Sequence, residues 1–85
     1  MKPTLEHISD ERPNLEDLQQ KVGGYIEVLS LGDGSQLVVN EDGYPKGLPV
    51  NDEAATLVAK HGANPAPRYD IVGNAVVLSG DAKLS

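Results

Sequence analysis

Five residues in two short segments have side chains suited to holding a ligand or a protein partner. They are Tyr44, Lys46, Asn51, Arg68 and Tyr69. The first two place an aromatic face beside a cation, and the last two repeat that combination after a proline-containing loop. If the two pairs converge in the fold, they would form a small polar and aromatic binding site. Asn51 stands where a helix is predicted to begin, and free N–H groups there could receive an anion.

The segment 44–51 also has a purely structural interpretation. Its two prolines and its glycine can turn the chain, Leu48 can be a single buried side chain, and Asn51 can cap a helix. Turn and cap chemistry accounts for the second half of the segment. It does not explain why Tyr44 and Lys46 occur at their positions. A binding role for these two residues is therefore a second hypothesis.

Residues for metal binding or nucleophilic catalysis are few. His7 and His61 are the only histidines and the chain has no Cys, so no ligand spacing typical of zinc occurs. No Ser stands in a Gly-x-Ser-x-Gly motif. Asp33, Glu41 and Asp42 could act as paired acids, but they lie in predicted turns, where carboxylates are usually solvated. We therefore predict a non-enzymatic protein with no cofactor and no metal.

Two short helices would position these candidates. Asn14 is a good N-cap and Gly23 a good stop for a helix over 15–22. Asn51 and Gly62 do the same for a second helix, which has acidic residues first and basic residues last. The expected packed faces are Leu15, Leu18 and Val22 in the first helix, and Ala54, Leu57, Val58 and His61 in the second.

Two β-hairpins are predicted around these helices. Tyr25–Leu31 and Gln36–Asn40 flank turn residues at 32–35. Tyr69–Val72 and Ala75–Leu78 flank Gly73-Asn74, a two-residue hairpin signal. The first strand has apolar residues on both faces, so either both faces are covered within the chain or one face meets a second copy.

The order of elements predicts a small single α+β domain, with a mainly antiparallel sheet of two hairpins and two short helices. The domain is expected over 14–80, with 1–13 as an N-terminal arm or edge strand and 81–85 as a polar tail. A chain of 85 residues is the size of one domain.

The charge balance limits the classes of partner. The net charge is −6, from 13 acidic and 7 basic residues, and the cations form no stripe. Direct nucleic-acid binding is therefore disfavoured, although an acidic face could mimic DNA toward a DNA-binding protein. No apolar run approaches the roughly 20 residues that span a bilayer, so we expect no membrane contact.

Several short blocks in order resemble the domain-of-unknown-function family 3846. They are Val22–Glu27, Asn40–Gly43, Gly47–Asn51 and Ile71–Leu78. Members of that family are common in bacteriophage genomes, so the resemblance implies an accessory protein in the cytoplasm of an infected bacterial host, with a role such as host takeover or anti-defence. It implies no reaction. Such proteins usually begin with a hydrophobic strand, whereas residues 1–13 here are polar.

Two hypotheses of function follow. The leading one is a homo-oligomeric interaction protein that binds and modulates a host or phage protein, because a strand edge and apolar strand faces would find a partner. The alternative is a homo-oligomeric binder that sequesters an anionic, nucleotide-like small molecule. Its contacts would be Tyr44, Lys46, Arg68 and Tyr69.

Overall fold

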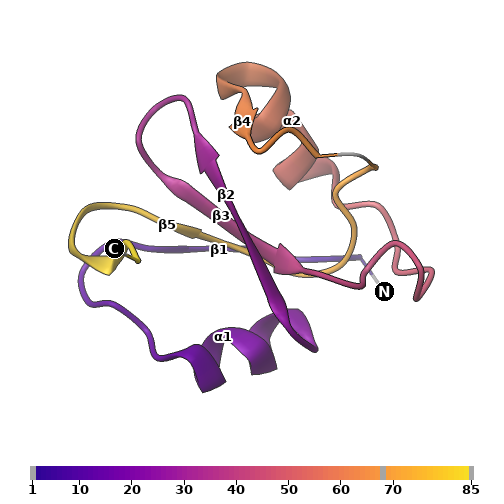
Figure 1. Cartoon of the computed structure of the whole chain (residues 1–85), viewed down its shortest axis with the longest axis horizontal. Coiled ribbons are helices and arrows are strands. Elements are labelled where there is room, and N and C mark those ends of the chain that lie inside the picture. The colour runs from indigo at the N-terminus through magenta and orange to yellow at the C-terminus, as the bar shows by residue number, and fades with distance from the viewer. Residues whose placement is uncertain (1, 68, 85) are drawn as a thin grey trace.

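A five-stranded mixed sheet lies between two helices in the computed structural model, which describes residues 2–67 and 69–84 (Figure 1). The strands are β1 (Leu5–Ile8), β2 (Ile26–Leu31), β3 (Gln36–Asn40), β4 (Ala63–Asn64) and β5 (Ala75–Leu78). The helices are α1 (Leu15–Val22), α2 (Asp52–His61) and a short 3-10 turn, η1 (Gly80–Ala82). The predicted α+β class is confirmed.

The sheet has the order β1-β5-β3-β2-β4. β2 and β3 form the predicted hairpin, in which Val28 faces Val38. β3 pairs antiparallel with β5 and β2 with β4, whereas β1 runs parallel to β5. The sheet is therefore mixed, because its first strand joins its last one in the same direction. The N-terminal segment was expected to be either an arm or an edge strand. Residues 5–8 form an edge strand of the sheet.

The second predicted hairpin does not form. β5 pairs with β3 and β1, and residues 69–72 form no strand beside it. They instead lie along the segment that leads into α2: Val72 bridges Val50, the Asn51 N–H donates to the Ile71 carbonyl, and the Gly73 N–H donates to the Pro49 carbonyl. The hairpin predicted from Gly73-Asn74 was wrong because these longer-range bonds take the place of pairing between residues 69–72 and β5.

Capping residues set the bounds of both helices as predicted. The Asn14 side chain accepts a hydrogen bond from the Asp17 N–H, and α1 ends at Gly23 with φ of 82°. The Asn51 side chain accepts one from the Ala54 N–H, and Gly62 follows the last residue of α2. Each cap satisfies a backbone group that would otherwise be left unpaired at a helix end.

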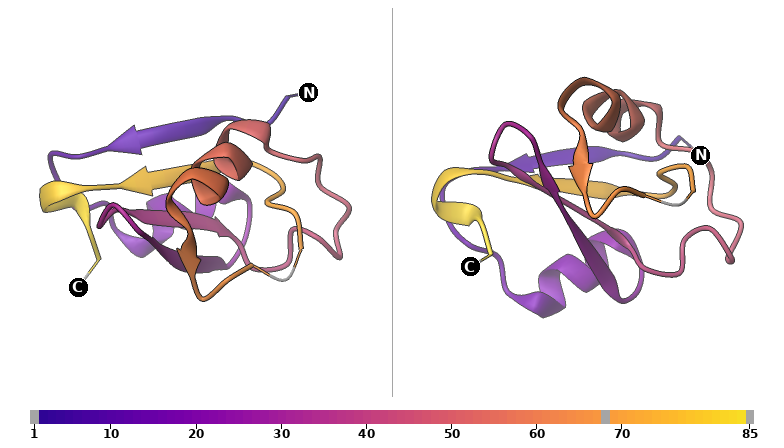
Figure 2. Two further views of the ribbon diagram at one scale, coloured as in Figure 1. Left: turned by 90° about the horizontal axis from the view of Figure 1, so that it is seen from above. Right: turned by 45° about the horizontal axis from the view of Figure 1, so that its top comes forward.

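The two helices cover opposite faces of the sheet (Figures 1 and 2). On one face α1 packs Leu18 and Val22 onto β3 and β5, and buried Ala82 of the C-terminal segment joins this cluster. On the other face α2 contributes buried Ala54 to a cluster around Leu29 and Leu37. The apolar residues on both faces of β2 are therefore explained by packing within the chain, because each face of the sheet is covered by a helix. Leu15, predicted to pack, is exposed.

Candidate functional site

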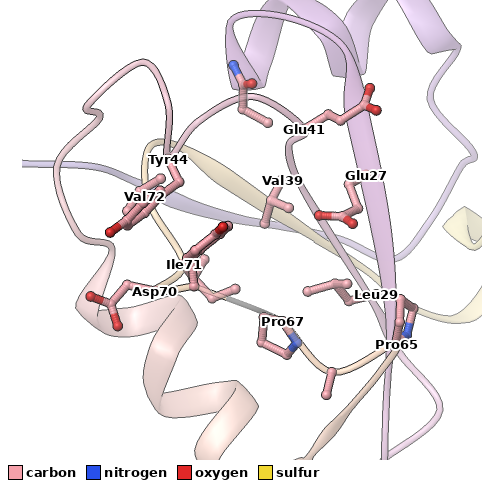
Figure 3. A pocket seen from close by; sticks show the side chains of 13 residues that line it. Glu27, Leu29, Val39, Glu41, Tyr44, Pro65, Pro67, Asp70, Ile71 and Val72 are labelled. Atoms are coloured by element: carbon pink, nitrogen blue, oxygen red, sulfur yellow. The ribbon is translucent and has the colours of Figure 1, made fainter.

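Tyr44 and Tyr69 stack on each other at the surface. Their ring centroids are 4.1 Å apart and their planes differ by 8°. Tyr44 comes from the turns that follow β3 (Figure 3). Tyr69 comes from the segment that lies before β5. Both residues remain more than half exposed, at 53% and 56%. The two segments therefore meet at Tyr44 and Tyr69, which fulfils for these two residues the condition set by the binding hypothesis.

The tyrosine pair borders an open pocket of about 290 Å³ on the α2 face of the sheet (Figure 3). Glu27 and Leu29 of β2 and Val39 of β3 form its floor, and the proline-containing loop after β4 forms one wall. The full lining comprises Glu27, Leu29, Val39, Asn40, Glu41, Tyr44, Pro65, Ala66, Pro67, Tyr69, Asp70, Ile71 and Val72. We call it the tyrosine pocket.

Three exposed carboxylates line the tyrosine pocket among the residues that the structure describes. Glu27, Glu41 and Asp70 line it, and no lining residue that the structure describes is basic. The ion pairs among residues 2–67 and 69–84 are Lys21 with Glu6 and His61 with Asp33, so none of the three carboxylates takes part in one there. Negative charge beside aromatic faces suits a cationic group better than an anionic one.

Lys46 does not line the tyrosine pocket. It lines a separate depression together with Gln19, Gly24, Tyr25 and Asp42. The expected pairing of Tyr44 with Lys46 around one ligand is therefore not formed. The remaining predicted cation, Arg68, lies outside the residues that the structure describes.

Asn51 is a structural residue. Its side chain is 1% exposed. Nδ2 donates to the carbonyl oxygens of Thr4 at 3.0 Å and Gly73 at 2.9 Å, while Oδ1 accepts from the Ala54 N–H at 3.0 Å. Because these bonds use both Nδ2 hydrogens and close off the helix start, the predicted ligand contact at Asn51 is corrected to a link between the start of α2 and the segments that precede β1 and β5.

The predicted turn carboxylate Asp33 is held by its own turn. Its Oδ1 accepts from the Ser35 hydroxyl at 2.6 Å and from the Ser35 N–H at 3.0 Å. The hydroxyl bond first, and then the backbone bond, lower the pKa of Asp33 below its ordinary value, and His61 adds a smaller effect. In the described part of the chain, no three His, Asp or Glu side chains gather as metal ligands would.

Sequence reasoning missed the acidic side of the pocket. Glu41 is the first residue after β3 and Asp70 follows Tyr69, so both stand beside residues that had been singled out. Glu27 shares a strand face with Leu29, which placed it over the core side of the sheet. The sequence positions of these three residues were known, but their convergence depends on where residues 63–67 and 69–72 lie relative to β2 and β3.

Fold and pocket together define a class: a small α+β domain whose sheet is covered on both faces and whose open pocket lies beside the strand ends. A family model, Domain of unknown function (DUF3846), matches residues 1–84, so the chain belongs to this family. This confirms the resemblance found in the sequence. Neither the curated proteins nor the solved structures contain a match. In the described residues, no helix has both the length and the apolar character needed to cross a membrane.

Proposed function

We propose that this protein is a non-enzymatic accessory protein of bacteriophage type, which binds and modulates a host or phage protein through the tyrosine pocket. The observation that carries the proposal is the exposed stack of Tyr44 on Tyr69. Aromatic residues are enriched at protein interfaces, where a rigid ring offers a large contact area at a small entropic cost. A pair already stacked before binding loses still less freedom when a partner covers it.

The surroundings of the stack favour a protein over a nucleotide as ligand. A nucleotide would bring phosphate charge next to Glu27, Glu41 and Asp70, and Lys46 lies in another depression. Phosphate groups and these carboxylates are both negatively charged and would repel each other, whereas a partner surface that carries basic side chains would be attracted. The cytoplasm of an infected bacterium is the compartment that the family resemblance implies for such a partner.

The test is an affinity capture with matched variants. Tagged wild-type protein, the Tyr44→Ala/Tyr69→Ala variant and a Tyr25→Ala control are incubated with lysates of phage-infected and uninfected bacteria. Tyr25 is a suitable control because it is also exposed, at 68%, but lines the other depression. We expect one protein to be captured in stoichiometric amount by the wild type and by Tyr25→Ala, and to be lost with the double variant.

Mass spectrometry of each eluate separates the two hypotheses, and light scattering of the free protein gives its oligomeric state. Equal capture by the double variant would refute the role of the tyrosine pocket. A clean protein lane with a co-purifying nucleotide would replace the proposal with ligand sequestration. Circular dichroism of each variant checks that the fold is kept, which we expect because neither ring is buried.

A further inference from the structure

β2 has an open edge beside the tyrosine pocket. Along its other side it pairs with β3 from Ile26 to Ser30. On this side β4 pairs only with Ser30 and Leu31, after which the chain leaves the sheet (Figure 1). The first four residues of β2 therefore have no neighbouring strand on this side within the described chain.

The direction of the backbone groups follows from the hairpin. The Leu31 N–H donates to the Ser35 carbonyl, and the Tyr25 carbonyl accepts from the Glu41 N–H. Because bonding residues alternate along an antiparallel strand, the odd-numbered residues of β2 bond to β3. Ile26 and Val28 must then direct their N–H and C=O groups to the open side. Unpaired groups of this kind are a template for an added strand.

The open edge and the pocket share the same residues. Glu27 lies between the two edge-facing residues, and its side chain points over the α2 face into the pocket, as does that of Leu29 (Figure 3). An added strand would place one residue directly opposite Glu27. That pair would not be hydrogen-bonded, so its side chains would lie close together on the same face.

The chemistry of the pocket defines that residue. It would meet the Glu27 carboxylate first, with Glu41, Asp70 and the faces of Tyr44 and Tyr69 beyond it. A guanidinium satisfies both kinds of partner, because it forms paired hydrogen bonds with carboxylates and stacks on aromatic rings. Lysine offers only a point charge to the same groups.

We propose that the open edge of β2 receives an extended segment of the partner protein as an added strand, with an arginine of that segment opposite Glu27 in the tyrosine pocket. This rests on the proposed function and names the chemistry of its partner. Main-chain bonds to Ile26 and Val28 supply affinity, and the pocket supplies specificity, as in other cases of strand addition.

The test uses a minimal strand as probe. The ¹⁵N-labelled full chain is titrated with acetyl-Val-Arg-Val-N-methylamide at millimolar concentrations, and amide shifts are followed by NMR. We expect saturable shifts at residues 26–29 and around the pocket. The same peptide with citrulline, which keeps the shape of arginine without its charge, should bind about five- to tenfold more weakly. N-methylation of the second valine should weaken binding as well, since it removes a main-chain donor.

Protein variants make the assignment specific. Glu27→Gln should weaken binding of the arginine peptide and leave the citrulline peptide nearly unaffected, while Glu11→Gln, also exposed but on the loop before α1, should change neither. An unperturbed spectrum elsewhere shows that each variant is folded. Absence of saturable shifts at residues 26–29, or equal affinity for both peptides, would overturn the proposal.

Two further outcomes separate this inference from the proposed function. A partner captured through the tyrosines, together with no binding of the arginine peptide, would overturn the added strand and leave the proposed function standing. Edge amides that shift with protein concentration, in a protein that dimerises, would assign the edge to a second copy and also overturn it.

Discussion

Replacing Asn51 with alanine should be the most destabilising change among the polar residues. The substitution removes the cap of α2, which costs about 1 kcal/mol. It also leaves the Gly73 carbonyl, which receives a buried bond from Nδ2, without that donor, at a cost of about 1–3 kcal/mol. The Thr4 carbonyl keeps the bond from the Ala75 N–H, so its loss adds little.

The sum is about 2–4 kcal/mol, a large part of the roughly 4–13 kcal/mol expected for a domain of this size. It should lower the melting temperature by about 8–32 °C. Urea unfolding followed by circular dichroism measures the free energy directly, and a thermal scan of the same samples measures the midpoint.

Asn14→Ala is the matched control, because Asn14 caps α1 with a single bond to the Asp17 N–H and is exposed. It should cost only about 1 kcal/mol. Asn51→Asp should be no milder than Asn51→Ala, because a carboxylate can keep the cap but would face two carbonyl oxygens. If Asn51→Ala and Asn14→Ala cost the same, the links from Asn51 to Thr4 and Gly73 contribute nothing and the structural role assigned to Asn51 is wrong.

Three further substitutions test other parts of the fold. Gly32→Ala should cost about 3 kcal/mol or more in urea unfolding, because an added methyl group would overlap the carbonyl oxygen of His61; a neutral result would mean that α2 lies farther from the hairpin. Leu18→Ala should cost about 3–5 kcal/mol by the same assay, since Leu18 is fully buried between α1 and the sheet. Asp33 has a pKa lowered by Ser35, so its contribution to stability is present above the unfolded pKa and is lost as the pH falls through the lower folded value. Asp33→Asn should therefore lose less stability than the wild type as the pH falls through the range in which Asp33 becomes protonated, and parallel pH profiles would contradict this.

Local signals were sufficient for the helices and the first hairpin. Both helices begin at an Asn whose side chain caps the first turn and end before a Gly, so their bounds are encoded within a few residues. The β2–β3 hairpin is likewise encoded by its turn, in which Asp33 holds the backbone of Ser35. Each of these features needs no information from a distant part of the chain.

Long-range pairing accounts for what local signals could not predict. Gly73-Asn74 has the composition of a hairpin turn, but the Asn74 side chain accepts from the Thr4 N–H and the Gly73 N–H donates to Pro49. These bonds draw β5 to the N-terminal strand and away from its sequence neighbour. The parallel pairing of β1 with β5 has no signature in either strand alone.

The candidate site was predicted only in part, because its formation also depends on contacts between distant segments. The sequence alone left open whether the segments that carry Tyr44 and Tyr69 converge, and the structure stacks these two residues on each other. Lys46 was assigned to the same group because it is close in sequence, yet the turns after β3 direct it to the depression beside Gly24. Asn51 was ambiguous between cap and ligand contact, and its burial decides for the cap.

The position of β5 between β1 and β3 has a consequence for biosynthesis. β5 is the last strand of the sheet to be synthesised, and neither β1 nor β3 can pair with it before then. At the usual elongation rates of about 5–20 residues per second, β1 remains unpaired for several seconds after it leaves the ribosome. The β2–β3 hairpin can form in that interval, whereas the layer beneath α1 lacks Val76 and Leu78 until translation reaches them. Folding should therefore be completed late, and the growing chain exposes its apolar strands to chaperones until then.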